Sequence, residues 1–396
     1  MAEWRPLAAN YRWLWANWVI FPILDIGRKF FISQEADYMS VQPLTHLLID
    51  TDVDFDDYMA ISYLLKHHAV KVEGITVTGV GAVHLTHGVE NISNFLTLFD
   101  DPEIERIPVA AGFQRPMVYS NTFPFETRQA SDQHYDAPFP RTNLNPTRTD
   151  AVAFLREALE NTDHNFTVLM IGGGTTWGHL FQQAETDDAL QDLLLTKIDR
   201  IVMMGGNLLP QYAQPGAAGN IIDALGDTPY YTNNVAEWNI FLDPLAAQYV
   251  FNGGIPVQLV ALNACNQIPI TQDFLRQLSR ISNPIAQFLT QVLQSSTIAP
   301  GIGAYLYFWD PLAAIAVTDP QFIQFTRYGL QVEQELNEEQ DTSGKLVPDK
   351  SGAPVDVALG TAPGFVRALY LNTIAGNSAE ATAENMANAT AVAADE

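Results

Sequence analysis

The 396-residue chain is short of cysteine, positive charge and long apolar runs, and each shortage excludes a class of protein. A single cysteine, Cys265, excludes an intramolecular disulfide framework and any zinc cluster built from thiolates. Only 20 lysines and arginines stand against 45 aspartates and glutamates, so the net charge of −25 excludes a basic surface for nucleic acid. With 47% apolar residues, the composition is that of a globular protein rather than a disordered or fibrous one.

The two ends of the chain differ from its middle. Residues 1–43 form an aromatic arm whose apolar segment 11–24 is too short to cross a bilayer as a helix, which needs about 20 residues. We expect this arm to pack on the body or on a second subunit, without stable membrane insertion. The location is expected to be cytoplasmic, with export or the periplasm as the alternative. Residues 376–396 carry almost no large apolar side chain and predict an acidic disordered tail.

The middle of the chain alternates short apolar runs with segments of helical period. Continuous β-branched runs are typical of strands buried on both faces of a parallel sheet. The predicted fold is therefore an α/β domain with a doubly wound, mainly parallel sheet, a helical C-terminal part and a small strand pair within 323–358. The expected strands are 44–50, 72–79, 107–112, 166–172, 200–206 and 255–262, and the expected helices are 56–68, 86–100, 149–161, 177–195, 243–252, 271–295 and 310–318.

Five aspartates within eight residues follow the first predicted strand, at positions 50, 52, 54, 56 and 57. Packing so many like charges is costly unless a cation or a helix N-terminus offsets them. A hard divalent cation such as Ca²⁺ binds through six to eight oxygen ligands. Capping of the next helix by Asp56 and Asp57 is the alternative interpretation, although a cap needs only one aspartate. An EF-hand is excluded because its required glycine and glutamate are absent.

Several segments, in order, resemble the nucleoside hydrolase family. Asp50-Thr-Asp52-x-x-x-Asp56-Asp57 resembles the family signature, although Val53-Asp54 stands where the family has Pro-Gly. The resemblance runs from about 44 to 320, and it implies a Rossmann-like nucleoside hydrolase fold with a catalytic domain over 44–375. The other matching segments are 75–79, 107–112, 172–176, 203–206, Ala-Glu-Trp-Asn within 236–247, and Trp-Asp-Pro-Leu-Ala at 309–313.

The resemblance implies one Ca²⁺ at the bottom of a pocket. Its protein ligands would be the carboxylates of Asp52, Asp57 and Asp310 and the backbone carbonyl of Thr175, with water and ribose hydroxyls in the other positions. These groups are hard oxygen donors, as Ca²⁺ requires. Asp52 would also act as the general base toward the attacking water, and cleavage would pass through an oxocarbenium-like transition state.

The resemblance assigns ribose contacts to Asp56, Glu237 and Asn239. A further asparagine normally stands shortly before the glutamate. Gly219-Asn220 fits the family's Gly-Asn pair, so we favour Asn220, with Asn233 and Asn234 as competitors at shorter spacing.

Two catalytic candidates depart from the common family pattern. His84 is placed either to contact substrate or to activate the leaving group, although a lone histidine is more often structural. Trp309 replaces a histidine, and its ring is suited either to stack on a purine, which favours purine nucleosides, or to pack in the core. The aromatic segment 120–140 predicts a lid that excludes water, but it lacks the family's motif there.

The sequence therefore favours a Ca²⁺-dependent hydrolase of ribonucleosides, and the resemblance implies a homodimer or homotetramer. Three alternatives stay open: a hydrolase of another N-ribosylated compound, a Ca²⁺-dependent ribose- or nucleoside-binding protein without turnover, and a phosphohydrolase with Asp50 or Asp52 as nucleophile. The departures at Val53-Asp54, at the family's missing asparagine and at its missing histidine keep the alternative without turnover open.

Overall fold

The computed structural model describes residues 44–221, 232–335 and 341–377. The predicted arm 1–43 and residues 378–396 of the predicted tail lie outside these described residues. The strands are β1 (Thr45–Thr51), β2 (Val70–Val77), β3 (Val109–Ala111), β4 (Phe166–Met170), β5 (Ile198–Met204), β6 (Val257–Val260), β7 (Ile323–Val332), β8 (Leu346–Pro348) and β9 (Ala353–Thr361).

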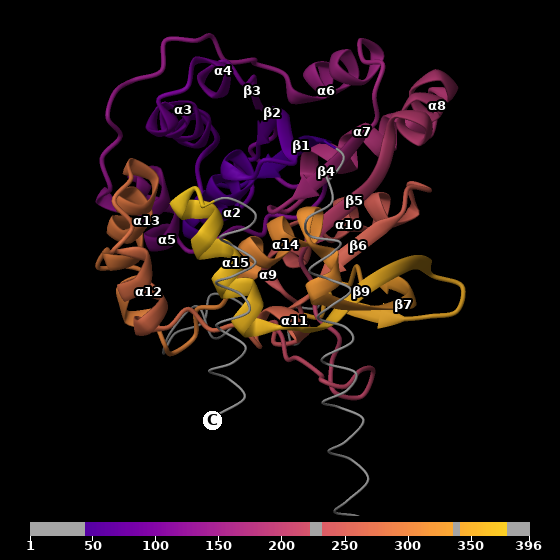
Figure 1. Cartoon of the computed structure of the whole chain (residues 1–396). Coiled ribbons are helices and arrows are strands. Elements are labelled where there is room, and N and C mark those ends of the chain that lie inside the picture. Colours follow the sequence, from indigo (N-terminus) through magenta and orange to yellow (C-terminus); the bar gives the residue numbers. More distant parts are fainter. Residues whose placement is uncertain (1–43, 222–231, 336–340, 378–396) are drawn as a thin grey trace, which may run out of the picture.

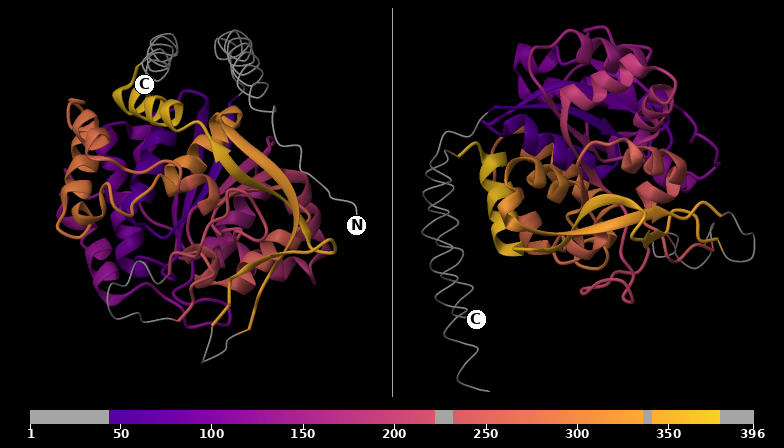
Figure 2. Two further views of the ribbon diagram at one scale, coloured as in Figure 1. Left: turned by 90° about the horizontal axis from the view of Figure 1, so that it is seen from below. Right: turned by 90° about the vertical axis from the view of Figure 1, so that its right-hand side faces the viewer.

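All nine strands form one sheet, in the order β3-β2-β1-β4-β5-β6-β9-β7-β8. Neighbours from β3 through β9 are parallel, and β7 is antiparallel to both β9 and β8. The doubly wound parallel sheet predicted from the sequence is thus confirmed. The predicted strand pair is also present, but it continues the main sheet through β9 instead of standing apart from it. Figure 2 shows β7 and β9 side by side at one border of the molecule.

The strand order reverses direction at β1. The chain first builds outward from β1 to β2 and β3, and then returns to the other side of β1 to place β4 and the strands after it. The loops that follow β1 and β4 therefore leave the sheet in opposite directions. In sheets of this kind, a ligand binds beyond the carboxyl ends of the strands at this reversal. The aspartates after β1 and the glycines after β4 lie there.

Alternate side chains along the strands pack into two separate hydrophobic cores, one on each face of the sheet. Leu47 and Ile49 join the core on one face, whereas Leu48 joins the core on the other. Both cores are covered by helices, as Figure 1 shows, so the strands are buried on both faces as their apolar runs predict. The first core is covered by α2 (Phe55–Lys66), α3 (Leu85–Phe95), α12 (Gln272–Leu278), α13 (Pro284–Gln294), α14 (Trp309–Thr318) and α15 (Pro363–Ala375), and the second by α6 (Ala151–Glu160), α7 (Thr175–Ala184), α8 (Asp188–Lys197) and α10 (Pro244–Asn252).

Two expected helices each divide into two. The segment 177–195 contains both α7 and α8, because the side chain of Asp187 accepts a hydrogen bond from the backbone N–H of Leu190 and starts a new helix. The segment 271–295 divides at Asn283-Pro284, where an asparagine cap precedes proline in the first turn. Five helices are not predicted from the sequence: α4 (Pro102–Glu105), α5 (Phe125–Asp132), α9 (Trp238–Leu242), α11 (Leu262–Cys265) and α15. Among the described helices, none has the length and apolarity needed to cross a bilayer.

Helix α2 sets the position of the acidic segment. Asp54 caps its first turn, accepting from Phe55 N–H at 2.7 Å, while the Asp57 side chain accepts from Asp54 N–H at 2.9 Å. This reciprocal capping box satisfies two backbone donors at the helix start. The rest of α2 is buried almost throughout, so the helix cannot rotate without exposing its apolar side chains.

We expect Leu64→Ala to lower the free energy of unfolding by about 2–5 kcal/mol, because Leu64 is fully buried in α2 and its truncation leaves a cavity. Urea unfolding followed by circular dichroism measures the change. Leu144→Ala is the matched control, since Leu144 is 92% exposed and its truncation should change stability by less than about 0.5 kcal/mol. Equal losses in the two variants would contradict this account of the core.

Candidate functional site

Three aspartates from two distant segments meet beyond the carboxyl ends of the strands. Asp56 and Asp57 lie in the first turn of α2, and Asp310 lies in the first turn of α14. One carboxylate oxygen of each lies within 4.8 Å of the other two, and all three residues are buried. The packing of α2 against α14 thus brings Asp310 to the acidic segment, as the sequence predicts.

Hydrogen bonds orient these carboxylates. The Thr51 hydroxyl, at the end of β1, donates to Oδ1 of Asp57. The backbone N–H of Asp310 donates to Oδ2 of Asp56 at 3.5 Å, which joins the starts of the two helices. Both contacts hold a carboxylate oxygen in place without bringing in a neutralising charge.

The electrostatics of the group fit a bound cation. Burial first, and then the charges of neighbouring aspartates, raise the pKa of Asp56, Asp57 and Asp310 well above the ordinary value. Each carboxylate therefore resists ionisation because the others are close and water is excluded. A hard divalent cation would reverse that balance, and its preferred ligands are the oxygen atoms that converge here.

Asp52 lies beside Asp56, Asp57 and Asp310 but is not a member of that group. Its charge contributes to the raised pKa of Asp57, and its own pKa is raised to about 7 by burial and by the charges of Asp54 and Asp50. Oδ2 of Asp52 accepts a hydrogen bond from the backbone N–H of Ala82 at 2.8 Å. The loop after β2 therefore clamps this carboxylate from the side.

Glycine is required where this loop approaches Asp52. A Cβ built at Gly81 would lie only 1.7 Å from Oδ2 of Asp52, so no side chain fits there. On the other side, a Cβ at Gly172 would lie 3.0 Å from the backbone nitrogen of Asp52. The backbones after β2 and β4 thus both reach the aspartate at the end of β1.

Val53 holds an unusual backbone conformation directly after Asp52. Its φ of 63° is in the left-handed region, which is strongly unfavourable for a β-branched residue. Its N–H donates to the Thr51 hydroxyl at 3.1 Å, and its carbonyl accepts from the Ser131 hydroxyl at 2.6 Å. Such strain costs about 1–3 kcal/mol and persists only where surrounding contacts fix it.

Thr175 begins α7, directly after Gly174, whose φ of 69° turns the chain into the helix. The Thr175 hydroxyl donates to Oδ2 of Asp243 at 2.7 Å, and Asp243 in turn caps α10. The Thr175 hydroxyl therefore holds the loop in place. That the backbone carbonyl of Thr175 binds a cation stays a prediction.

Glu237 and Asn239 lie together at the start of α9, and both are buried. Oε1 of Glu237 accepts from the N–H of Asn239 at 2.9 Å, and Oε2 accepts from Gly206 N–H at 2.7 Å. Nδ2 of Asn239 donates to the carbonyls of Ile171 and Met204. This pair is thereby tied to the segments after β4 and at the end of β5.

The three candidate asparagines have different surroundings. Asn220 lies next to Glu237, since its side-chain oxygen accepts from the N–H of Trp238 at 3.1 Å. Asn233 is fully buried and bonds to backbone groups of its own turn and to the Ser343 carbonyl. Asn234 is exposed. Asn220 as the ribose contact stays a prediction.

His84 pairs with Asp132 and not with the aspartate trio. It precedes α3, its side chain is half exposed, and its Nδ1 lies 2.7 Å from Oδ2 of Asp132. The pair borders a cavity of about 450 Å³ that Gly79, Gln114 and Arg128 also line. A role for His84 in the reaction stays a prediction.

The segment 120–140 supplies contacts that sequence reasoning missed. Arg128 donates to the carbonyls of Gly79 and Val83, and the Tyr135 hydroxyl donates to Asp54. Ser131 and Asp132 of the same segment contact Val53 and His84, as described above. The aromatic content of this segment was the only signal in the sequence that it belongs to the site.

Trp309 directly precedes Asp310 and is partly buried. Its ring makes an edge contact with Phe55, with centroids 6.2 Å apart, and a tilted contact with Tyr307 at 6.0 Å. Its indole Nε1 is buried and has no hydrogen-bond partner among the described residues. The ring therefore borders the acidic site from the α14 side.

Asp50 is an unsuitable nucleophile. Its side chain is fully buried, Oδ1 accepts from the Thr76 hydroxyl at 2.5 Å, and burial raises its pKa to about 7. A phosphohydrolase nucleophile must be ionised and reachable by a phosphate. These surroundings argue against Asp50 as the nucleophile of a phosphohydrolase.

Comparison with known proteins points in one direction. The family model described as inosine-uridine preferring nucleoside hydrolase matches residues 47–392. A pyrimidine-specific ribonucleoside hydrolase RihA from Shewanella sp. (strain MR-7) is 27% identical over 325 residues, which cover 79% of this chain and 90% of the relative.

Solved structures share the fold. An inosine-uridine preferring nucleoside hydrolase from Bacillus anthracis superposes with a TM-score of 0.67 at 22% identity, over 84% of this chain and 100% of the other. A purine-preferring ribonucleoside hydrolase from Gardnerella vaginalis gives 0.68 at 23% identity, over 84% and 98%. These two likenesses concern the fold alone.

The buried Glu237 predicts a pH-dependent contribution to stability. Burial raises its pKa from 4.5 to about 7, against the backbone hydrogen bonds that lower it. Between pH 4.5 and about 7 the folded protein keeps the proton on Glu237, whereas the unfolded chain releases it. Stability is therefore lost as the pH rises from about 4.5 to about 7. Relative to Glu237→Gln, the wild type should lose on the order of 3 kcal/mol over this range.

Urea unfolding at several pH values between 4.5 and 8 measures this difference. Glu126→Gln is the matched control, because Glu126 is exposed and its curve should run parallel to that of the wild type. Parallel curves for the wild type and Glu237→Gln would show that Glu237 is ionised in the folded protein throughout.

Proposed function

The chain belongs to the inosine-uridine preferring nucleoside hydrolases, and on this premise we propose that it hydrolyses the N-glycosidic bond of ribonucleosides, with purine nucleosides preferred. The products are a free base and ribose. The observation that carries the proposal is the meeting of Asp56, Asp57 and Asp310 beside Asp52 at the reversal of strand order. A nucleoside that reaches this point can place its ribose against the acids and its base toward Trp309.

The proposed cofactor is Ca²⁺. Asp57 and Asp310 would hold it, with Asp52 and the Thr175 carbonyl as the further ligands that the resemblance implies. Asp56 is close enough to serve either as a ligand or as the ribose contact. When bound, Ca²⁺ would supply Lewis-acid chemistry that lowers the pKa of water.

Asp52 is the proposed general base. Its carboxylate lies beside the aspartates of the proposed cation site, where it can accept a proton from the attacking water. Because Ala82 N–H occupies Oδ2, Oδ1 is the atom that takes the proton from the attacking water. The neighbouring carboxylates favour positive charge on the ribose ring, which develops as the glycosidic bond breaks.

Ribose binding is assigned to Asp56, Asn220, Glu237 and Asn239. Glu237 and Asn239 are held by backbone groups just after β4 and at the end of β5, so they are positioned before substrate arrives. Asn220 lies on the same side, through its contact with Trp238 N–H.

Binding of the leaving base is assigned to Trp309, and its protonation is assigned to His84. A half-buried indole offers a flat face for a purine ring, and this supports the purine preference. His84, paired with Asp132, is the proposed proton donor to the leaving base.

Asp52→Asn should lower ribose release by at least about 100-fold, because it keeps the shape of the side chain but removes the base. Ribose release from inosine, adenosine, guanosine, uridine and cytidine measures activity, with and without EDTA. Asp192→Asn, an exposed aspartate on α8, is the matched control and should keep full activity.

The same assay separates the alternatives. Ribose release that stops with EDTA and returns with Ca²⁺ supports the proposal. Nucleoside binding without release would mean a binding protein, and phosphate release from a nucleotide would mean a phosphohydrolase. An Asp52→Asn enzyme with normal turnover would remove Asp52 from the mechanism.

Trp309→Ala should lower kcat/KM for inosine and guanosine about 2- to 10-fold more than for uridine and cytidine, as the loss of a ring stacking contact predicts. Tyr305→Ala, whose ring is 49% exposed, is the aromatic control and should affect both classes equally. An equal loss for purines and pyrimidines in Trp309→Ala would contradict the stacking role.

A further inference from the structure

A second group of metal-ligating side chains lies at the opposite end of the strands from the aspartates. His46 is near the start of β1, Glu73 lies in β2, and His164 stands two residues before β4. At about 3.3 Å per residue, His46 and Asp52 are separated by about 20 Å along the chain. We propose that His46, Glu73 and His164 bind a divalent transition metal ion of the zinc type, independently of the acidic site.

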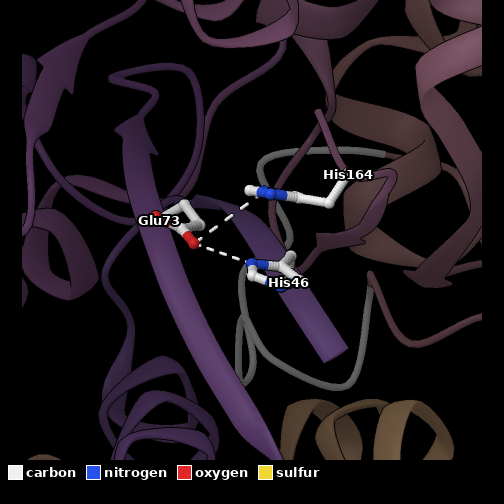
Figure 3. Close-up of side chains that lie close together, drawn as sticks. All are labelled: His46, Glu73 and His164. Atoms are coloured by element: carbon white, nitrogen blue, oxygen red, sulfur yellow. Dashed lines mark hydrogen bonds and ion pairs between the residues drawn. The ribbon is translucent and has the colours of Figure 1, made fainter. Parts of the chain in front are cut away.

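The distances suit such an ion. Figure 3 shows both imidazole rings turned toward the Glu73 carboxylate. Nδ1 of His46 lies 2.8 Å from Oε1 of Glu73, and Nε2 of His164 lies 3.8 Å from the same oxygen. Zinc bonds of about 2.0–2.1 Å in a tetrahedron place neighbouring ligands about 3.3 Å apart. The two observed distances lie on either side of this value, so small side-chain rotations would bring all three atoms into range.

One of the three proposed ligand atoms has no hydrogen-bond partner among the described residues. This atom is the buried Nε2 of the His164 ring. Its other ring nitrogen, Nδ1, lies 3.6 Å from the carboxylate of Asp163. A buried unpaired nitrogen is costly, and a metal at this point would satisfy it.

A bulge in the sheet lies at Glu73, on the strand next to His46. Leu47 pairs with Val72, but Leu48 pairs with Gly74, so Glu73 is an extra residue between two regular pairs. Bulges redirect a side chain out of the regular alternation. The rings of His46 and His164 stack with centroids 3.5 Å apart, so one ring must rotate before both nitrogens can face the same ion.

The donor set selects the kind of metal. Two imidazoles and a carboxylate suit Zn²⁺ and its transition-metal neighbours, whereas Ca²⁺ and Mg²⁺ require oxygen ligands. Three protein ligands leave a further position for water. The ion would join β1, β2 and the segment before β4, so its binding should stabilise the fold.

Lys71 competes for the same carboxylate. Its Nζ lies 2.8 Å from Oε1 of Glu73, but its side chain is 58% exposed. An exposed ion pair is weak, so the ammonium can move away when a metal binds. Removing this competitor should therefore strengthen metal binding.

The test is a Zn²⁺ titration of the full chain, first freed of metal with EDTA and then held in excess Ca²⁺ to occupy the acidic site. The wild type should bind one Zn²⁺ per chain, with a rise of at least about 3 °C in the unfolding midpoint. His46→Gln and His164→Gln should lose both effects. Lys71→Met should bind about 2- to 5-fold more tightly, because it removes a weak ion pair. His68→Gln, an exposed histidine outside the group, should behave as the wild type.

Ribose release by His164→Gln should be unchanged, which separates this site from the proposed hydrolase site. If His164→Gln retains the Zn²⁺ equivalent, or the wild type takes up none, the three residues are only a hydrogen-bonded cluster. Should the histidine variants fail to fold, X-ray absorption of the Zn²⁺-loaded wild type decides. Two imidazole nitrogens in the shell support the proposal, and a shell of oxygen alone overturns it.

Discussion

Mutual repulsion among buried carboxylates is the constraint on which the site depends. Asp56, Asp57 and Asp310 are held together by the packing of α2 against α14, which buries mostly apolar surface. The hydrophobic cores thus hold together charges that would otherwise separate. A cation that binds there lowers the cost of this arrangement, so cofactor binding and folding are coupled through the same two helices.

The strands and the acidic segment could be predicted because their signals are local. Each expected strand is a continuous apolar run, and the aspartates of the first segment lie within eight residues of one another. Asp310 carries no such signal, since it is a single aspartate 253 positions after Asp57. Only its place in an ordered series of family-like segments pointed to it.

Other features could not be read from the sequence, for identifiable reasons. Arg128 and Ser131 reach the site through backbone carbonyls, which every residue possesses, so their contacts leave no pattern. The bulge at Glu73 depends on how two strands align, and neither strand alone encodes that alignment. By contrast, the division between α7 and α8 was missed although it has a local signal, because Asp187 is a good helix cap.

The two outermost strands of the sheet, β3 and β8, are only three residues long each. A wide sheet with long, exposed outer strands would invite other chains to add to it by backbone hydrogen bonding. β8 itself offers few donors and acceptors, but it pairs only with residues 330–332 of the ten-residue β7, so the rest of that outer edge has no strand partner in the described sheet. On that stretch Arg327, which is 70% exposed and paired with Asp356, places a charge that disfavours the addition of another chain.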